Sequence, residues 1–156
     1  MIEKFDIIKR IFTCVLAVLQ PFIIYFFCGD LVSISQSWTT QLQPLFIFTN
    51  ALVSYFFFDL PKWRIPAVLL LLLTVFSVEN WFVLHNILAV SFFILSGVSM
   101  FSLKKFRFYI PLYLLSLFFL LNGGFFWMET WAIVCLVFYH MHIMLYTLWI
   151  GRNYSN

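Results

Sequence analysis

Chemistry in this chain can come from only a few side chains, because its 156 residues include three His, three Cys and six Asp or Glu. His85 and Glu129 are the most promising pair, because a carboxylate and an imidazole in contact can bind a ligand or share a proton. We expect them to form one polar cluster with Glu79, Asn86 and Ser35, joined directly, through Asn86 or Glu79, or through water. We interpret this cluster as a candidate ligand-binding site and assign no catalytic residue.

The pair His140 and His142 suggests a metal site, but its spacing argues against one. Residues two apart on a helix diverge by about 200°, whereas two ligands from one helix need a spacing of three or four. His85 cannot complete a set, because His140 lies roughly 15 Å deeper at about 1.5 Å per residue. The sequence therefore predicts no metal site.

The cysteines and the short motifs indicate no cofactor. Cys14, Cys28 and Cys135 form no C-x-x-C pair, and we expect them to pack as small apolar side chains. The sequence contains no Gly-rich phosphate loop, no nucleophile elbow and no H-E-x-x-H zinc motif.

The elements that position these residues must be membrane helices. The chain is 64% hydrophobic, 22% aromatic and only 10% charged, with a mean hydropathy of +1.02. A soluble domain is about 25% charged, so this chain cannot cover a water-facing surface. We therefore predict an all-α, polytopic membrane helix bundle that forms a single transmembrane domain over residues 1–156.

The apolar runs divide into six segments at clusters of charge, Pro or Gly. The predicted transmembrane spans are 11–27, 44–60, 65–80, 81–103, 108–121 and 125–150. The third and fifth are short, so they either cross with local thinning of the bilayer or are re-entrant. Pro44 is placed for a first helical turn, and Gly123 and Gly124 are placed for a tight helical hairpin.

The basic residues decide the orientation. With six crossings, all of them lie on one side of the membrane: Lys4, Lys9, Arg10, Lys62, Arg64, Lys104, Lys105, Arg107 and Arg152. The positive-inside rule makes that side the cytoplasm, so both termini are expected there and the protein is expected in the inner (plasma) membrane. Because topology explains these charges, a net charge of +3 gives no indication of nucleic-acid binding.

Other residues fit this arrangement. Trp38, Trp81 and Trp127 are expected at the outer interface, and Trp63 and Trp149 at the inner one. A stripe of small residues in the fourth span predicts close helix packing: Ser96, Gly97, Ser99 and Ser102.

His85 and Glu129 stand out against this background. Each lies about one turn inside a predicted span, near the outer face, where an unpartnered polar group is costly. The outer face offers no Lys or Arg as a partner. This cost is the reason for expecting the two side chains to meet.

Two strings of residues point to a family. The string SISQSWTT at 33–40, followed by a Phe-rich helix at 46–58, and the string HNILAVSFF at 85–93 resemble small bacterial six-helix membrane proteins. The group is the Frag/DRAM/Sfk type within the CREST superfamily, and the resemblance covers about residues 29–101. It implies a receptor, sensor or lipid-organising role.

The enzymatic branch of that superfamily is similar to alkaline ceramidase and implies a zinc-dependent amide hydrolase. Its enzymes use Ser and His on one helix, Asp on the next and His-x-x-x-His on the last. This chain has Trp81 one turn before His85, His140 and His142 at the wrong spacing, and no Asp in the fourth or fifth span. These departures argue against hydrolase activity.

We therefore expect a non-enzymatic membrane protein. It binds membrane lipid or a small amphipathic ligand at the outer leaflet, or it serves as an accessory subunit of a partner membrane protein. Two alternatives stay open: a metal-dependent membrane lipid or amide hydrolase that uses His85, Glu129 and Glu79, and a small proton-coupled transporter.

Overall fold

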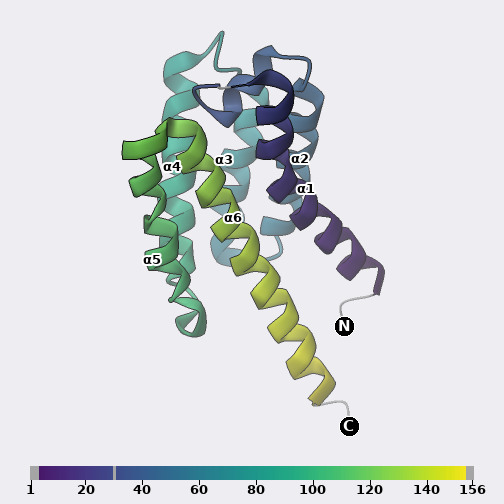
Figure 1. Cartoon of the computed structure of the whole chain (residues 1–156). Coiled ribbons are helices and arrows are strands. Elements are labelled where there is room, and N and C mark those ends of the chain that lie inside the picture. The colour runs from purple at the N-terminus through teal and green to yellow at the C-terminus, as the bar shows by residue number, and fades with distance from the viewer. Residues whose placement is uncertain (1–3, 30, 154–156) are drawn as a thin grey trace.

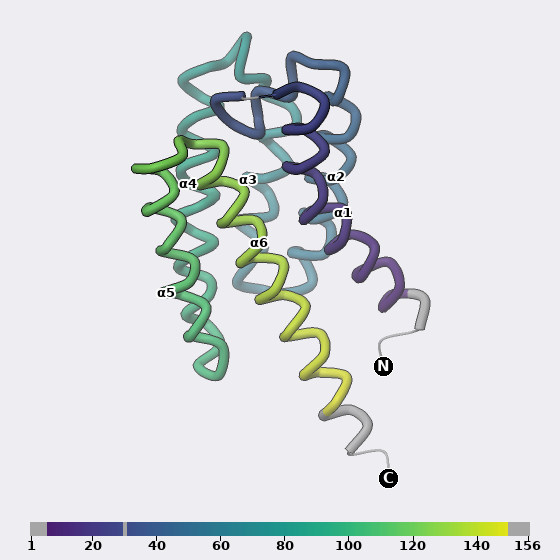
Figure 2. Tube along the Cα trace, viewed as in Figure 1, coloured from purple at the N-terminus to yellow at the C-terminus, as the bar shows by residue number. Residues whose placement is uncertain are grey.

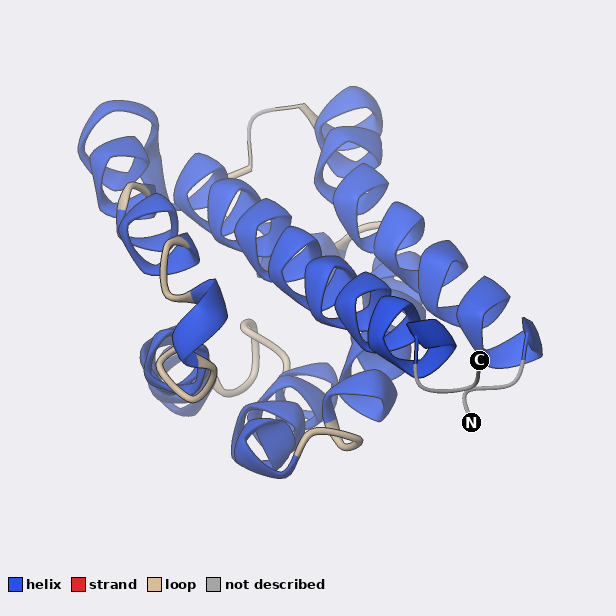
Figure 3. Ribbon diagram, turned by 90° about the horizontal axis from the view of Figure 1, so that it is seen from below, coloured by secondary structure: helices blue, strands red, loops and turns tan. Residues whose placement is uncertain are grey.

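The computed structural model describes residues 4–29 and 31–153, and the regular elements in them are all helical. The α-helices are α1 (Lys4–Cys28), α2 (Gln43–Phe57), α3 (Arg64–Val75), α4 (Phe82–Met100), α5 (Tyr109–Leu114) and α6 (Ser116–Asn153). Short 3-10 helices separate some of them: η1 (Ile34–Thr39), η2 (Pro61–Trp63) and η3 (Lys104–Phe106). Figure 3 shows only helix and loop in the described part, so the predicted all-α class is confirmed.

The helices pack in chain order and close into a ring. Each of the helices α1 to α5 contacts the next one along the chain, and α6 returns to contact α1. The chain runs up and down the bundle, and the Lys4 end of α1 and the Asn153 end of α6 lie at the same end, opposite η1 (Figure 1). We call the end that holds η1 the η1 end.

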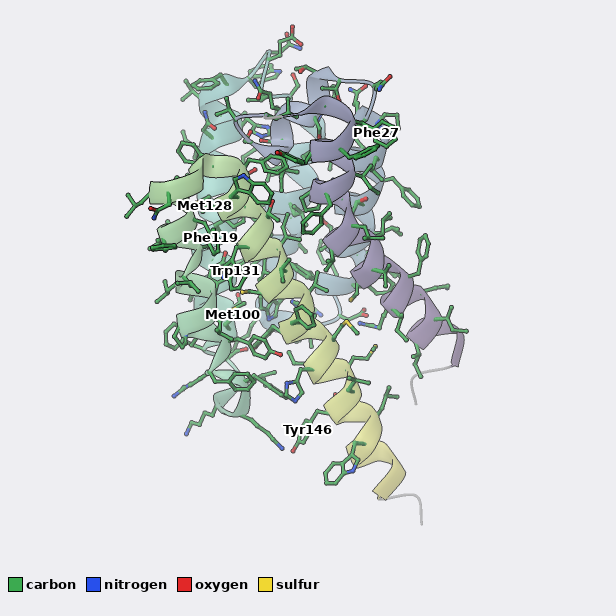
Figure 4. All side chains as sticks on the ribbon, in the orientation of Figure 1. Phe27, Met100, Phe119, Met128, Trp131 and Tyr146 are labelled. Carbon is green, nitrogen blue, oxygen red and sulfur yellow. The ribbon has the colours of Figure 1, made fainter. Side chains whose placement is uncertain are left out.

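Three helical stretches are long and apolar enough to cross a membrane: Asp6–Cys28, Phe82–Met100 and Tyr109–Trp149. Large apolar side chains project outward around the bundle (Figure 4), and Phe26 and Leu121 are 81% and 85% exposed. Water-soluble proteins rarely expose contiguous surfaces of this kind. The outer surface therefore suits contact with lipid, as a membrane protein requires.

The third predicted span ends earlier than expected. It was predicted to reach residue 80, but α3 ends at Val75, and Phe76 adopts an extended conformation (φ −93°, ψ 98°). One cause is local, because the Ser77 hydroxyl accepts the N–H of Asn80 at 3.2 Å. In a continuing helix, this N–H would donate to the Phe76 carbonyl instead. That carbonyl is left free for another donor.

The hairpin between the fifth and sixth predicted segments is confirmed. Gly124 breaks the helical conformation with φ 79° and ψ −177°, and Figure 2 shows the chain reversing there. Across the hairpin, Phe119 stacks on Trp131 with ring centroids 5.0 Å apart (Figure 4). Trp131 also donates from Nε1 to the Leu112 carbonyl at 2.7 Å, which fixes the descending part of α6 against α5.

The Trp63 side chain, predicted at the inner interface, is buried within the bundle and does not face outward. Only 1% of its side chain is exposed, whereas Trp81 and Trp149 are 54% and 62% exposed. The reason is that η2 folds against the bundle, where the Ser99 hydroxyl donates to the Lys62 carbonyl at 2.8 Å. The Trp63 indole is thereby directed into the core.

The small-residue stripe on α4 does mark close packing. Ser96 is fully buried. A Cβ added to Gly97 would lie 3.3 Å from the Tyr113 ring, so a larger residue there would push the ring away by a few tenths of an ångström. Tyr113 in turn donates to the Phe93 carbonyl at 2.9 Å, which holds α5 on α4.

Candidate ligand-binding cavity

A cavity of about 370 Å³ lies inside the ring of helices. Residues of α1, α2, α3, α4, α6 and η1 line it, and most of them are apolar. On α6 the lining extends from Glu129 to Thr147, about 27 Å at ~1.5 Å per residue. This length approaches the roughly 30 Å thickness of the hydrocarbon core of a bilayer.

Glu129 lies at the η1 end of the cavity and connects α6 to η1. Its carboxylate oxygen Oε2 accepts the N–H of Ile34 at 2.6 Å, and the side chain is 8% exposed. The first N–H groups of any helix lack an intrahelical acceptor, so the carboxylate satisfies one of these donors. Ser35 is buried beside it and lines the same cavity.

His85 lines the cavity from α4 and is fully buried. Its Nδ1 lies 2.6 Å from the Phe76 carbonyl, the group that the early end of α3 sets free. A carbonyl can only accept, so Nδ1 carries the proton, and Nε2 of the neutral ring is a hydrogen-bond acceptor. Nε2 is buried and has no partner among the described residues.

Further polar groups in the wall also lack partners. The Gln20 amide nitrogen on α1, the Thr49 hydroxyl on α2 and His140 Nε2 on α6 are buried without a hydrogen bond in the described part of the chain. Buried polar atoms are almost always hydrogen-bonded in folded proteins. Several unpartnered groups around one cavity indicate a wall suited to a bound molecule or to water.

An ion pair lies at the opposite end of the cavity. Arg10 on α1 pairs with Asp59, just beyond α2, and both residues line the cavity. The Arg10 guanidinium also lies over the Phe56 ring, 4.8 Å from its centroid. We call this the Arg10–Asp59 end.

The predicted polar cluster divides in the structure. His85, Glu129 and Ser35 line the cavity, whereas Glu79 and Asn86 are exposed and outside its lining. Asn86 follows His85 directly, and a step of about 100° around α4 turns it away. No hydrogen bond joins His85 to Glu129 within the described residues; His85 Nδ1 is bonded to the Phe76 carbonyl, and Glu129 Oε2 to the Ile34 N–H.

Sequence reasoning did not single out Gln20, Thr49 or the Arg10–Asp59 pair as site residues. Gln20 and Thr49 carried a signal, because each is a polar residue inside an otherwise apolar run. The pairing of Arg10 with Asp59 spans 49 positions in the chain and had no local signal.

The two histidines on α6 diverge, as their spacing predicts. His140 stacks on Phe57 with ring centroids 4.3 Å apart, whereas His142 contacts Phe106 at 4.8 Å on η3. Among the residues that the structure describes, no group of three His, Cys, Asp or Glu could hold a metal ion.

Comparisons with protein-family models, curated proteins and solved structures found no match to this chain. Its resemblance to the Frag/DRAM/Sfk-type group therefore stays a prediction that depends on two short strings of residues.

Proposed function

We propose that this chain is a non-enzymatic, multi-pass protein of the inner (plasma) membrane that binds one amphipathic ligand in its internal cavity. Six helical segments cross the bilayer, and both termini lie in the cytoplasm. The polar part of the ligand lies at the η1 end, toward the outer leaflet, and its apolar part lies along the bundle. A membrane lipid or a lipid-like small molecule fits this description.

The arrangement of the basic residues supports the orientation. The helices alternate in direction (Figure 1), and η2 and η3 connect helices at the end where α1 begins and α6 ends. These connections contain or adjoin Lys62, Arg64, Lys104, Lys105 and Arg107. All these charges therefore lie at one end of the bundle, and the positive-inside rule assigns that end to the cytoplasm.

The cavity is the observation that carries the proposed activity. Its 370 Å³ falls in the lower part of the range of roughly 300–1,000 Å³ that small-molecule sites occupy. Such sites are mostly apolar with a few polar groups that orient the ligand. The unpartnered groups of Gln20, Thr49 and His85 match that pattern.

Labelling of single cysteines tests the orientation, after the native cysteines are replaced by serine. Ser37 lies in the predicted outer loop, but its side chain is fully buried, so the nearby exposed Thr39 is the better site. A membrane-impermeant maleimide added outside intact cells should modify Thr39→Cys and spare Lys105→Cys. The reverse pattern would invert the topology.

Native mass spectrometry of protein released from nanodiscs tests ligand binding. Ala89 lines the cavity on α4, so Ala89→Phe should fill it and remove copurifying lipid-like molecules. Ala51 is also a half-buried helical alanine, but it lies outside the lining, so Ala51→Phe is the matched control. Equal occupancy in wild type, Ala51→Phe and Ala89→Phe would refute binding in the cavity.

A small proton-coupled transporter is the second candidate. It is favoured by the extent of the cavity along α6 and by its polar groups at both ends, Glu129 at one and Arg10 with Asp59 at the other. Release of a preloaded ligand across a proteoliposome membrane, driven by a proton gradient, would favour it over a binding protein. Stoichiometric zinc in the purified protein would instead favour the hydrolase alternative.

A further inference from the structure

The η1 end of the cavity accepts hydrogen bonds and offers no cation. Glu129 uses Oε2 for Ile34, and no hydrogen bond of the described residues uses Oε1. His85 adds a buried acceptor at Nε2, because its Nδ1 is bonded to Phe76. Arg10 is the only Lys or Arg in the lining of the described cavity, and it belongs to the opposite end.

Glu129 and His85 both line the part of the cavity nearer the η1 end. His85 lies one turn into α4, with its N–H bonded to the Trp81 carbonyl at 2.8 Å, and Glu129 follows the Gly124 break by little more than one turn. Both helices begin or turn toward the η1 end there, and both residues line the same cavity. A carboxylate in such an apolar site is stabilised most by a positively charged donor.

We propose that the cavity selects a single-chain amphiphile whose head is a protonated amine. This inference rests on the proposed function and adds the chemistry of the ligand head group. The ammonium group donates to Glu129 Oε1, and His85 Nε2 and the Thr49 hydroxyl, which line the same cavity, can accept further hydrogen bonds. The alkyl chain lies along the apolar lining toward Phe57 and Leu136.

The Arg10–Asp59 end supports this choice and fixes the direction of the ligand. The Asp59 carboxylate at that end is already paired with Arg10, so it offers no free counter-ion to a second ammonium group, and a diamine that spans the cavity is disfavoured. An anionic head group is disfavoured at the η1 end, because Glu129 is there without a cation. A monoamine with an apolar tail therefore matches both ends.

Three probes of equal chain length test the head group: dodecylamine, dodecanol and dodecanoate. Binding to wild-type protein in zwitterionic nanodiscs is measured by native mass spectrometry. Dodecylamine should bind at least tenfold more tightly than dodecanol, and dodecanoate should bind most weakly. This ranking needs no variant, so it tests the proposal even if a substituted protein fails to fold.

Glu129→Gln then tests the residue itself. The amide oxygen can still accept the Ile34 N–H, so the contact with η1 is kept while the charge is removed. The affinity for dodecylamine should fall at least tenfold, with little change for dodecanol. Glu79→Gln removes an equal charge from an exposed position outside the cavity, and it should bind dodecylamine as the wild type does.

The outcomes separate this inference from the proposed function. If dodecanol binds as tightly as dodecylamine and Ala89→Phe abolishes binding of both, the cavity binds amphiphiles but the amine selectivity is overturned. If Ala89→Phe binds all three probes as the wild type does, the cavity is not the site and both proposals fail. If Glu129→Gln and Glu79→Gln lower the affinity for dodecylamine equally, the effect comes from the overall charge of the protein, and the role of Glu129 is overturned.

Discussion

Replacing Gly124 by alanine should destabilise the protein through its backbone alone. Gly124 has φ 79° and ψ −177°, a combination that residues with a side chain almost never adopt. A Cβ at this position would meet nothing within 4 Å, so neither a clash nor a new contact contributes. The full cost is the conformational strain of an L-residue there, roughly 1–3 kcal/mol.

We therefore expect Gly124→Ala to lower the free energy of unfolding by about 2 kcal/mol, roughly a 30-fold change in the equilibrium constant. The assay is equilibrium unfolding by sodium dodecyl sulfate in mixed micelles, followed by circular dichroism and tryptophan fluorescence. Leu121→Ala is the matched control, because Leu121 is helical, close by and 85% exposed. It should change stability by less than about 0.5 kcal/mol.

One result would refute this reasoning. If Gly124→Ala is as stable as the wild type, the reversal between the ascending and descending helices does not depend on a glycine-only conformation. A loss equal to that of Leu121→Ala would lead to the same conclusion, because the backbone at 124 would then contribute nothing of its own.

Two further predictions concern the Arg10–Asp59 end and the α6 histidines. Asp59→Asn removes the charged partner of Arg10. In a protein whose other cysteines are serine, a maleimide added from the cytoplasmic side should then modify the cavity residue Cys14 several-fold faster. An unchanged rate of modification would mean that the ion pair does not limit access at this end. His140→Ala should cost about 1–2 kcal/mol more than His142→Ala in the unfolding assay, because His140 packs between two aromatic rings whereas His142 is exposed; equal losses would contradict that packing.

The sequence predicts the helical class and the hairpin because both depend on strong local signals. Long apolar runs make helices obligatory in a membrane, since every backbone polar group must be satisfied within its own segment. The Gly123-Gly124 pair has the conformational freedom that a reversal needs, and Gly124 uses it. The early end of α3 had no such signal, because it depends on the hydroxyl of Ser77 and on the donor His85.

The candidate site could be predicted only in part. The cost of burying polar groups correctly drew attention to His85 and Glu129, and both line the cavity. The backbone partners of these side chains, the Phe76 carbonyl and the Ile34 N–H, were not anticipated, because only the folded chain brings them near. Burial cost alone says that a partner must exist, and it does not say which one.

The closure of the ring by α1 and α6 has a consequence for how the protein is made. Ile34 and Glu129 are separated by 95 positions, so the contact that joins η1 to α6 must wait until the last helix leaves the ribosome. Until then, the cavity that Gln20 on α1 lines lacks the wall that α6 provides. Chains that stop before α6 therefore lack one wall of the cavity, because α6 supplies part of its lining. In such chains, the face of α1 that contacts α6 is exposed, and a membrane protease could recognise it. Only chains that include α6 would then be able to bind the ligand in the cavity.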